Sequence, residues 1–146
     1  MNIKITVAST TAAYEAGDLI GAKNTLTDIW EYSNQTPILC NLTVRDLTKQ
    51  NAAMTIVIFD ADPTGTTFTD NAALDIADAD LAKVIAVIPV AATDYVSFND
   101  NSVATVRNLA IPLDAASGND IYCAVVSGGA PAYVANELGL TFGFLR

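Results

Sequence analysis

The chain has 146 residues, of which 51% are hydrophobic and only 16% are charged. This length fits one domain, and the composition is that of a globular protein with a sizeable core rather than of a disordered chain. No apolar run approaches the roughly 18 residues of a transmembrane helix, so no membrane partner is expected. The N-terminus lacks the basic and apolar regions of a secretory signal, which indicates a protein made and used without export.

The net charge is −9, from 16 acidic and 7 basic residues. A protein that binds a phosphate backbone needs a basic surface, so this balance argues against nucleic acid as a partner. The chain contains no histidine. Because imidazole is the commonest general base near neutral pH and a frequent zinc ligand, its absence excludes most hydrolase and zinc-site designs.

Alternation of apolar and polar residues predicts β-strands along the whole chain. Strands with one buried face are predicted at residues 2–7, 38–45, 109–113 and 138–144. Runs that are apolar on both faces cover residues 54–59, 84–90 and 121–126. These three runs predict more central strands. Pro89 and Pro112 lie within or beside strand runs, so they are expected at sheet edges or strand ends.

Turn signals rich in Gly, Pro, Asn and Asp separate these runs, as in antiparallel sandwiches and barrels. They fall at residues 16–18, 34–37, 62–65, 99–102, 117–120 and 127–131. Only residues 78–83 have a helical composition, which predicts one short helix capped by Asp78. We find no tandem repeat, linker or domain boundary. Residues 1–146 are therefore predicted to form a single all-β domain, an antiparallel β-sandwich of jelly-roll type.

An acidic motif follows the 54–59 run, with Asp60, Asp62, Thr64 and Gly65 in close spacing. The spacing matches the Asp-x-Asp-x-Thr of haloacid-dehalogenase-type phosphatases and the first positions of an EF-hand calcium loop. The phosphatase chemistry needs a parallel sheet with crossover helices, and a downstream acidic pair, and the sequence has neither. The EF-hand needs a bidentate Glu at position twelve, where this chain has Asn71.

Two interpretations of this segment remain. Asp62-Pro63-Thr64-Gly65 has the residue preferences of a type I turn, which would end the preceding strand. Alternatively, the six Asp residues from Asp60 to Asp80 would supply the hard oxygen ligands that a loosely bound Ca²⁺ prefers. Whether this segment binds a cation is left open, and no residue is assigned as a metal ligand.

Other candidate residues are few. Trp30, Tyr32, Tyr95 and Tyr133 are candidates for a sugar-binding or partner surface, although such residues more often pack in or around a core. Cys40 and Cys123 lie in apolar runs and are expected to be buried free thiols. Whether they pair is left open, because a disulfide depends on geometry. Without histidine the serines have no activating base, so we predict no catalytic residue, no cofactor and no enzyme activity.

Five segments carry a resemblance to a known family. They are AAYEAGDLIG, IVIFDADPTGTTFTDNAALDIADADLAKVIAVI, NSVATVRNLAIPL, DIYCAVVSGGAPAY and LGLTFGFL. Together they resemble a family of small, mostly uncharacterised proteins encoded among the virion-structure genes of tailed bacteriophages. The similarity extends from about Ala13 to Leu145, and the long second segment is its most specific part.

The resemblance implies a virion component, and it carries over no catalytic residue to this chain. By analogy with the small β-sandwich proteins of phage capsids, we expect a capsid decoration or cement protein on the capsid surface. Its expected partners are the major capsid protein and other copies of the chain, with a homotrimer favoured. A tail, neck or fibre module and a carbohydrate-binding module are the alternatives.

Overall fold

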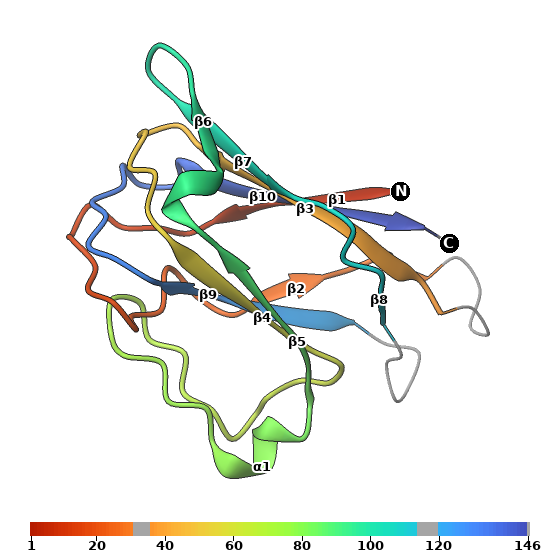
Figure 1. The fold of residues 1–146 in the computed structure, drawn as a ribbon. Coiled ribbons are helices and arrows are strands. Elements are labelled where there is room, and N and C mark those ends of the chain that lie inside the picture. Colours follow the sequence, from red (N-terminus) through yellow and green to blue (C-terminus); the bar gives the residue numbers. More distant parts are fainter. Residues whose placement is uncertain (31–35, 114–119, 146) are drawn as a thin grey trace.

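The computed structural model describes residues 1–30, 36–113 and 120–145. They form two antiparallel sheets packed face to face, which confirms the predicted all-β sandwich (Figure 1). Parts of the turns predicted at 34–37 and 117–120 lie outside the described residues. No helix in the described part of the chain is long and apolar enough to span a membrane.

Two sheets make up the sandwich, and all their strand pairs are antiparallel. Sheet A has the order β1 (Asn2–Val7), β10 (Leu138–Leu145), β3 (Ile38–Asp46), β7 (Ser102–Val106) and β6 (Tyr95–Ser97), with β8 (Ile111–Pro112) also paired to β3. Sheet B has the order β2 (Asn24–Leu26), β9 (Ile121–Ser127), β4 (Met54–Phe59) and β5 (Val84–Val90). Two short helices, α1 (Asp78–Leu81) and η1 (Ala92–Asp94), flank β5 along the chain.

The strand order is that of a jelly roll. β1 pairs with β10, β2 with β9, β3 with β7 and β4 with β5, so strands from the first half pair in reverse order with strands from the second half. Successive pairs alternate between sheet A and sheet B. One long antiparallel ribbon that wraps into two facing sheets gives this pattern. β6 is an addition, since it forms a hairpin with β7 at the edge of sheet A.

The main core lies between the two sheets and draws side chains from both. Ile56 and Ile58 of β4 face Leu140 and Phe142 of β10 across one contiguous cluster, and all four are fully buried. The alternation seen in the sequence therefore places one face of each strand in a shared interior.

A second apolar cluster covers the outer face of sheet B. Val57 and Phe59 of β4 and Ala124 of β9 point away from the main core and are buried beneath the long loop of residues 60–77. The rings of Phe59 and Phe68 meet edge to face, with centroids 6.3 Å apart. Figure 1 shows this loop on the side of sheet B that faces away from sheet A. The two-faced apolar patterns of β4 and β9 thus correspond to central strands, as predicted.

β5 is an edge strand, so the prediction of a central strand at residues 84–90 is wrong. Its outward side chain Val87 is 60% exposed, because the cover provided by the 60–77 loop does not extend over it. Pro89 has no N–H to donate to another strand. Its position on the edge strand β5 confirms the prediction that it lies at a sheet edge or strand end. Pro112 ends β8, also as predicted.

Two other local predictions need correction. The helix is shorter than predicted and is not capped by Asp78: its N-cap is Ala77, whose N–H donates to Thr66 Oγ1 at 3.1 Å. In the 109–113 run only β8 is regular, because Asn108 and Ala110 have φ values of 59° and 49°, which interrupt an extended strand.

We predict that Phe142→Ala lowers the free energy of unfolding by about 3–5 kcal/mol, because it removes a fully buried aromatic side chain and leaves a cavity. Urea denaturation followed by circular dichroism measures the loss. Val96→Ala, at a 62% exposed site in the same sheet, is the control and should change stability by less than about 0.5 kcal/mol. Equal effects of the two substitutions would contradict the assigned core.

Candidate functional site

The acidic segment predicted from the sequence is the 60–77 loop and the helix that follows it. Asp70 fastens the middle of this loop to the N-terminal part of the chain. Its Oδ1 accepts hydrogen bonds from the Tyr14 hydroxyl at 2.8 Å and from the Gly21 N–H at 2.6 Å. This carboxylate therefore acts as an internal acceptor that holds the loop over sheet B.

Asp80 fastens the end of the loop in the same way. Its side chain is buried, and it accepts hydrogen bonds from Lys83 Nζ at 2.7 Å and from Thr66 Oγ1 at 2.8 Å. The hydrogen bond from Lys83 lowers the pKa of the Asp80 carboxyl, assisted by Thr66 and opposed by burial. A Cβ atom at Gly65 would lie 3.2 Å from Asp80 Oδ2, so the glycine leaves room for this carboxylate.

Asp62 fastens the start of the loop through an ion pair with Lys23. The same Lys23 ammonium lies 5.7 Å from the Phe68 ring centroid and 5.2 Å from that of Tyr122, within range of cation–π attraction. Lys83 Nζ also donates to the Asp62 carbonyl oxygen at 2.7 Å. Charge and ring contacts thus position the loop against the outer face of sheet B.

The turn predicted at Asp62–Gly65 is present but lies one residue later. The backbone hydrogen bond runs from the Thr66 N–H to the Pro63 carbonyl oxygen at 3.4 Å. The strand before it ends at Phe59 in an antiparallel sheet, not in the parallel sheet that the phosphatase chemistry requires.

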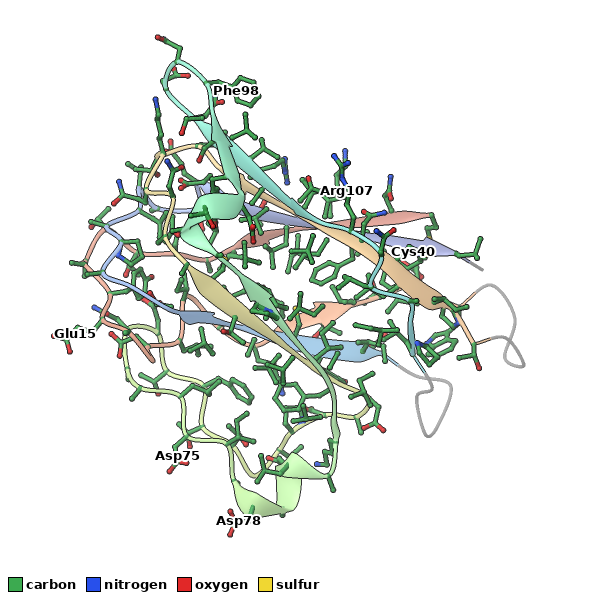
Figure 2. The ribbon with its side chains drawn as sticks, in the orientation of Figure 1. Glu15, Cys40, Asp75, Asp78, Phe98 and Arg107 are labelled. Carbon is green, nitrogen blue, oxygen red and sulfur yellow. The ribbon has the colours of Figure 1, made fainter. Side chains whose placement is uncertain are left out.

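The acidic side chains of the segment point in different directions. Asp62, Asp70 and Asp80 are engaged by donors of the protein itself, whereas Asp75 and Asp78 project into solvent (Figure 2). Within residues 1–30, 36–113 and 120–145, no three Asp, Glu or Cys side chains are grouped as metal ligands would be. The segment is thus built as an anchored cover of sheet B.

The described residues among the aromatic candidates do not form a shared surface. Tyr133 is buried in the main core, where its ring centroid lies 6.3 Å from that of Tyr14, and Trp30 and Tyr95 pack against the same core. Burial raises the pKa of both Tyr95 and Tyr133. Tyr32 lies outside the described residues. These three aromatic side chains therefore serve packing, the alternative that the sequence also allowed.

The two cysteines are free thiols in different environments. Cys123 is fully buried, and burial raises the pKa of its thiol to about 12. Cys40 is only half-buried, so the prediction of burial holds for Cys123 alone.

The outer face of sheet A is a surface that we did not identify from the sequence. We call it the cationic face. Its side chains are Asn2, Lys4 and Thr6 of β1, Asn41, Thr43 and Arg45 of β3, Val103 and Thr105 of β7, Val96 of β6, Thr141 of β10, and Arg107 just after β7. The signal was present as Lys, Arg, Thr and Asn at the polar positions of strands predicted to have one buried face.

This face carries the described positive charges that are not used elsewhere. Lys23 and Lys83 form ion pairs, and Lys49 donates to two backbone carbonyl oxygens. The other three basic side chains of the described residues, Lys4, Arg45 and Arg107, are exposed on the cationic face. No strand position on this face holds a carboxylate, which sets it apart in a chain of net charge −9.

Glycines keep the cationic face flat. Gly139 and Gly143 alternate with Thr141 on β10, which lies between β1 and β3. A Cβ atom at Gly139 would lie 2.6 Å from an Arg45 guanidinium nitrogen, and one at Gly143 would lie 2.6 Å from Asn41 Nδ2. Side chains of β3 therefore lie across β10, and the surface has few projections.

One corner of the face is apolar. Val96 and Phe98 are 62% and 57% exposed, and Val96 lies directly opposite Val103 in the β6–β7 hairpin. Asp94, Thr105 and Arg107 border a shallow hollow with these three apolar side chains. Figures 1 and 2 show the hairpin projecting beyond the body of the sandwich, with Phe98 near its tip.

No protein-family model matches the chain, and a comparison with curated proteins finds no significant match. The resemblance to a phage virion family therefore remains an expectation from the sequence.

Asp80→Asn should lower the melting temperature at neutral pH, because it weakens the interaction with Lys83. The pKa of Asp80 is lower in the folded chain than in the unfolded chain, so the stabilisation is complete above the unfolded value of about 3.9. It is lost as the pH falls through the folded pKa. The gap between wild type and variant should therefore narrow below about pH 4, measured by thermal denaturation from pH 7 to 2.5. Exposed Asp78→Asn is the control, and a gap that widens in acid would contradict the assignment.

In the native protein, a maleimide should react with Cys40 and leave Cys123 unmodified, because a buried thiol with a pKa of about 12 presents little thiolate. Mass spectrometry should find one adduct before denaturation and two in guanidinium without reductant. Cys40→Ser should abolish the native adduct. A single adduct in guanidinium would contradict the two free thiols.

Proposed function

We propose that the chain is a non-enzymatic structural protein of a phage virion, a decoration protein that binds the outer surface of the major capsid protein as a homotrimer. The observation that carries the proposal is the cationic face, a broad and flat sheet surface with a small apolar corner. It is supported by the jelly-roll body and by the resemblance of most of the chain to phage virion proteins.

The physical properties of this face fit a surface contact. Threonine and asparagine side chains on neighbouring strands offer many hydrogen-bond donors and acceptors over a flat area. Lys4, Arg45 and Arg107 are spread across it, which suits an extended acidic surface better than a compact anion. Many copies on one particle would add up weak individual contacts.

A carbohydrate-binding module is less well supported. Sugar sites commonly use exposed aromatic rings, whereas Trp30, Tyr95 and Tyr133 pack against the main core. No strand position of the cationic face carries an aromatic side chain, and Phe98 at its apolar corner offers a single exposed ring. A tail, neck or fibre position would use the same face, and only the location on the particle separates it from a capsid position.

Purified protein should bind stoichiometrically to heads assembled without it, and the double variant Arg45→Gln/Arg107→Gln should bind about tenfold more weakly, with a smaller dependence on salt. Co-sedimentation at several salt concentrations measures both effects. Thr64→Glu/Ala79→Glu is the matched control, because it lowers the net charge by the same two units in the 60–77 loop and α1, which lie on the side of sheet B that faces away from sheet A.

Absence of wild-type binding to such heads would contradict the decoration role. Equal weakening by the two double variants would show a general charge effect and would contradict the assigned face. If antibodies against the protein label the tail of native particles in electron micrographs, the tail, neck or fibre alternative replaces the decoration role.

A further inference from the structure

The β6–β7 hairpin differs from most other places where apolar side chains are exposed, because it projects beyond the body of the sandwich. Leu81, Val87 and Val134 are each about half exposed or more, but they lie in separate parts of the chain. Leu145 lines a second hollow with Ile38, Cys40 and Ala110, which lies at the other end of β3. Single exposed apolar residues are ordinary on protein surfaces. Val96, Phe98 and Val103 instead line one hollow together, and Phe98 lies at the projecting end.

The tip of this hairpin is held in place by the neighbouring loop of residues 47–51. Lys49 Nζ donates to the carbonyl oxygens of Phe98 and Asn99 at 2.8 and 3.2 Å. Asn51 Nδ2 donates to Ser97 Oγ at 3.0 Å. Within the hairpin, the Phe98 N–H donates to the Asn101 carbonyl oxygen at 2.8 Å. The backbone that carries Phe98 is therefore fixed from two directions.

A buried carboxylate holds that loop in turn. Asp46, at the end of β3, is fully buried and accepts hydrogen bonds from the N–H groups of Thr48 at 3.1 Å and Asn51 at 2.9 Å. Lys49 and Asn51 have φ values of 55° and 51°, a left-handed conformation that is costly for side chains with a Cβ. The chain accepts this strain in a loop that braces the hairpin on one side and hydrogen-bonds residues 132–137 on the other.

The charges beside the hairpin indicate the kind of surface it meets. Arg107 borders the hollow, and Arg45 lies directly opposite Val103 across β3 and β7. Asp94 also borders the hollow, but its carboxylate accepts a hydrogen bond from the Ala91 N–H at 2.8 Å. The Asp100 carboxylate at the tip likewise accepts one from Asn101 Nδ2 at 3.1 Å, whereas no hydrogen bond or ion pair from a described residue engages the two guanidinium groups. An apolar anchor next to exposed guanidinium groups is complementary to an apolar pocket with carboxylates along its rim. A rigid aromatic side chain loses little conformational entropy when it enters such a pocket.

We propose that Phe98 is the principal anchor of the cationic face and inserts into an apolar, acid-rimmed pocket of the capsid surface, with Lys49 and Asp46 as positioning residues. This inference rests on the proposed function and adds to it the residue that dominates binding and the chemistry of the pocket.

The test compares the binding of full-length variants to heads assembled without the protein. Phe98→Ala should weaken binding by about tenfold to a hundredfold, and Phe98→Leu should recover part of the loss. Leu81→Ala is the matched control, because Leu81 is 53% exposed against 57% for Phe98 and lies on α1 at the opposite end of the molecule. The control should bind like the wild type. Melting temperatures close to the wild-type value would show that all three variants fold.

Lys49→Met tests the brace separately. It should weaken binding by about threefold to tenfold, mainly through slower association, while the interface residues stay unchanged. Hydrogen exchange should be faster at the amides of residues 97–101 in this variant. A purely structural effect would instead lower the melting temperature and leave the binding of the folded fraction unchanged, which would overturn the positioning role.

The outcomes separate the two proposals. If the wild type binds and Arg45→Gln/Arg107→Gln weakens binding while Phe98→Ala does not, the anchor is overturned and the decoration role stands. If the wild type does not bind such heads, both proposals fall. If Phe98→Ala and Leu81→Ala weaken binding equally, the contact is non-specific and the anchor is again overturned.

Discussion

Both faces of the β4–β9 pair are apolar, and both have to be removed from water. Sheet A covers one face through the main core, and the 60–77 loop covers the other by burying Val57, Phe59 and Ala124. A two-layer sandwich alone would leave this second face exposed. The long connection between β4 and β5 is thus a third layer of the fold, and the structure around it depends on keeping that layer in place.

Polar contacts at three points keep the layer in place. Asp62, Asp70 and Asp80 receive hydrogen bonds or an ion pair from Lys23, Tyr14 and Lys83, among other donors. These side-chain contacts add to backbone hydrogen bonds between the loop and residues 17–19. The Asn71 and Leu74 N–H groups donate to the Leu19 and Gly17 carbonyl oxygens at 2.9 and 3.0 Å, and the Leu19 N–H donates to the Ala72 carbonyl oxygen at 2.9 Å. Much of the acidity that resembles a metal loop in the sequence is therefore used to attach a cover to a sheet.

The sequence predicts what depends on neighbours along the chain. Alternation places the strands, and the two apolar faces of 54–59 and 121–126 mark central strands correctly. The same pattern at 84–90 is an edge strand, because the extent of the cover over Val87 depends on the path of a distant loop. The partners of Asp70 lie 56 and 49 residues away, so its role could not be derived from local spacing. The individual polar positions of the cationic face were visible in the sequence, but its arginines and lysine come from three separate strand regions that only the strand order brings together.

The third layer also decides which surface remains available for contact. With the outer face of sheet B occupied by the 60–77 loop, the outer face of sheet A is the broad sheet surface that stays open among the described residues. On it, Gly139 and Gly143 give up side-chain packing, and the space is taken by Arg45 and Asn41 lying across the strand. Glycine in a strand interior weakens the strand, so their presence on β10, an interior strand of sheet A, has a cost. In return, the absence of side chains at these two positions lets Arg45 and Asn41 lie along the sheet. A face without projecting side chains suits a protein that binds another broad surface.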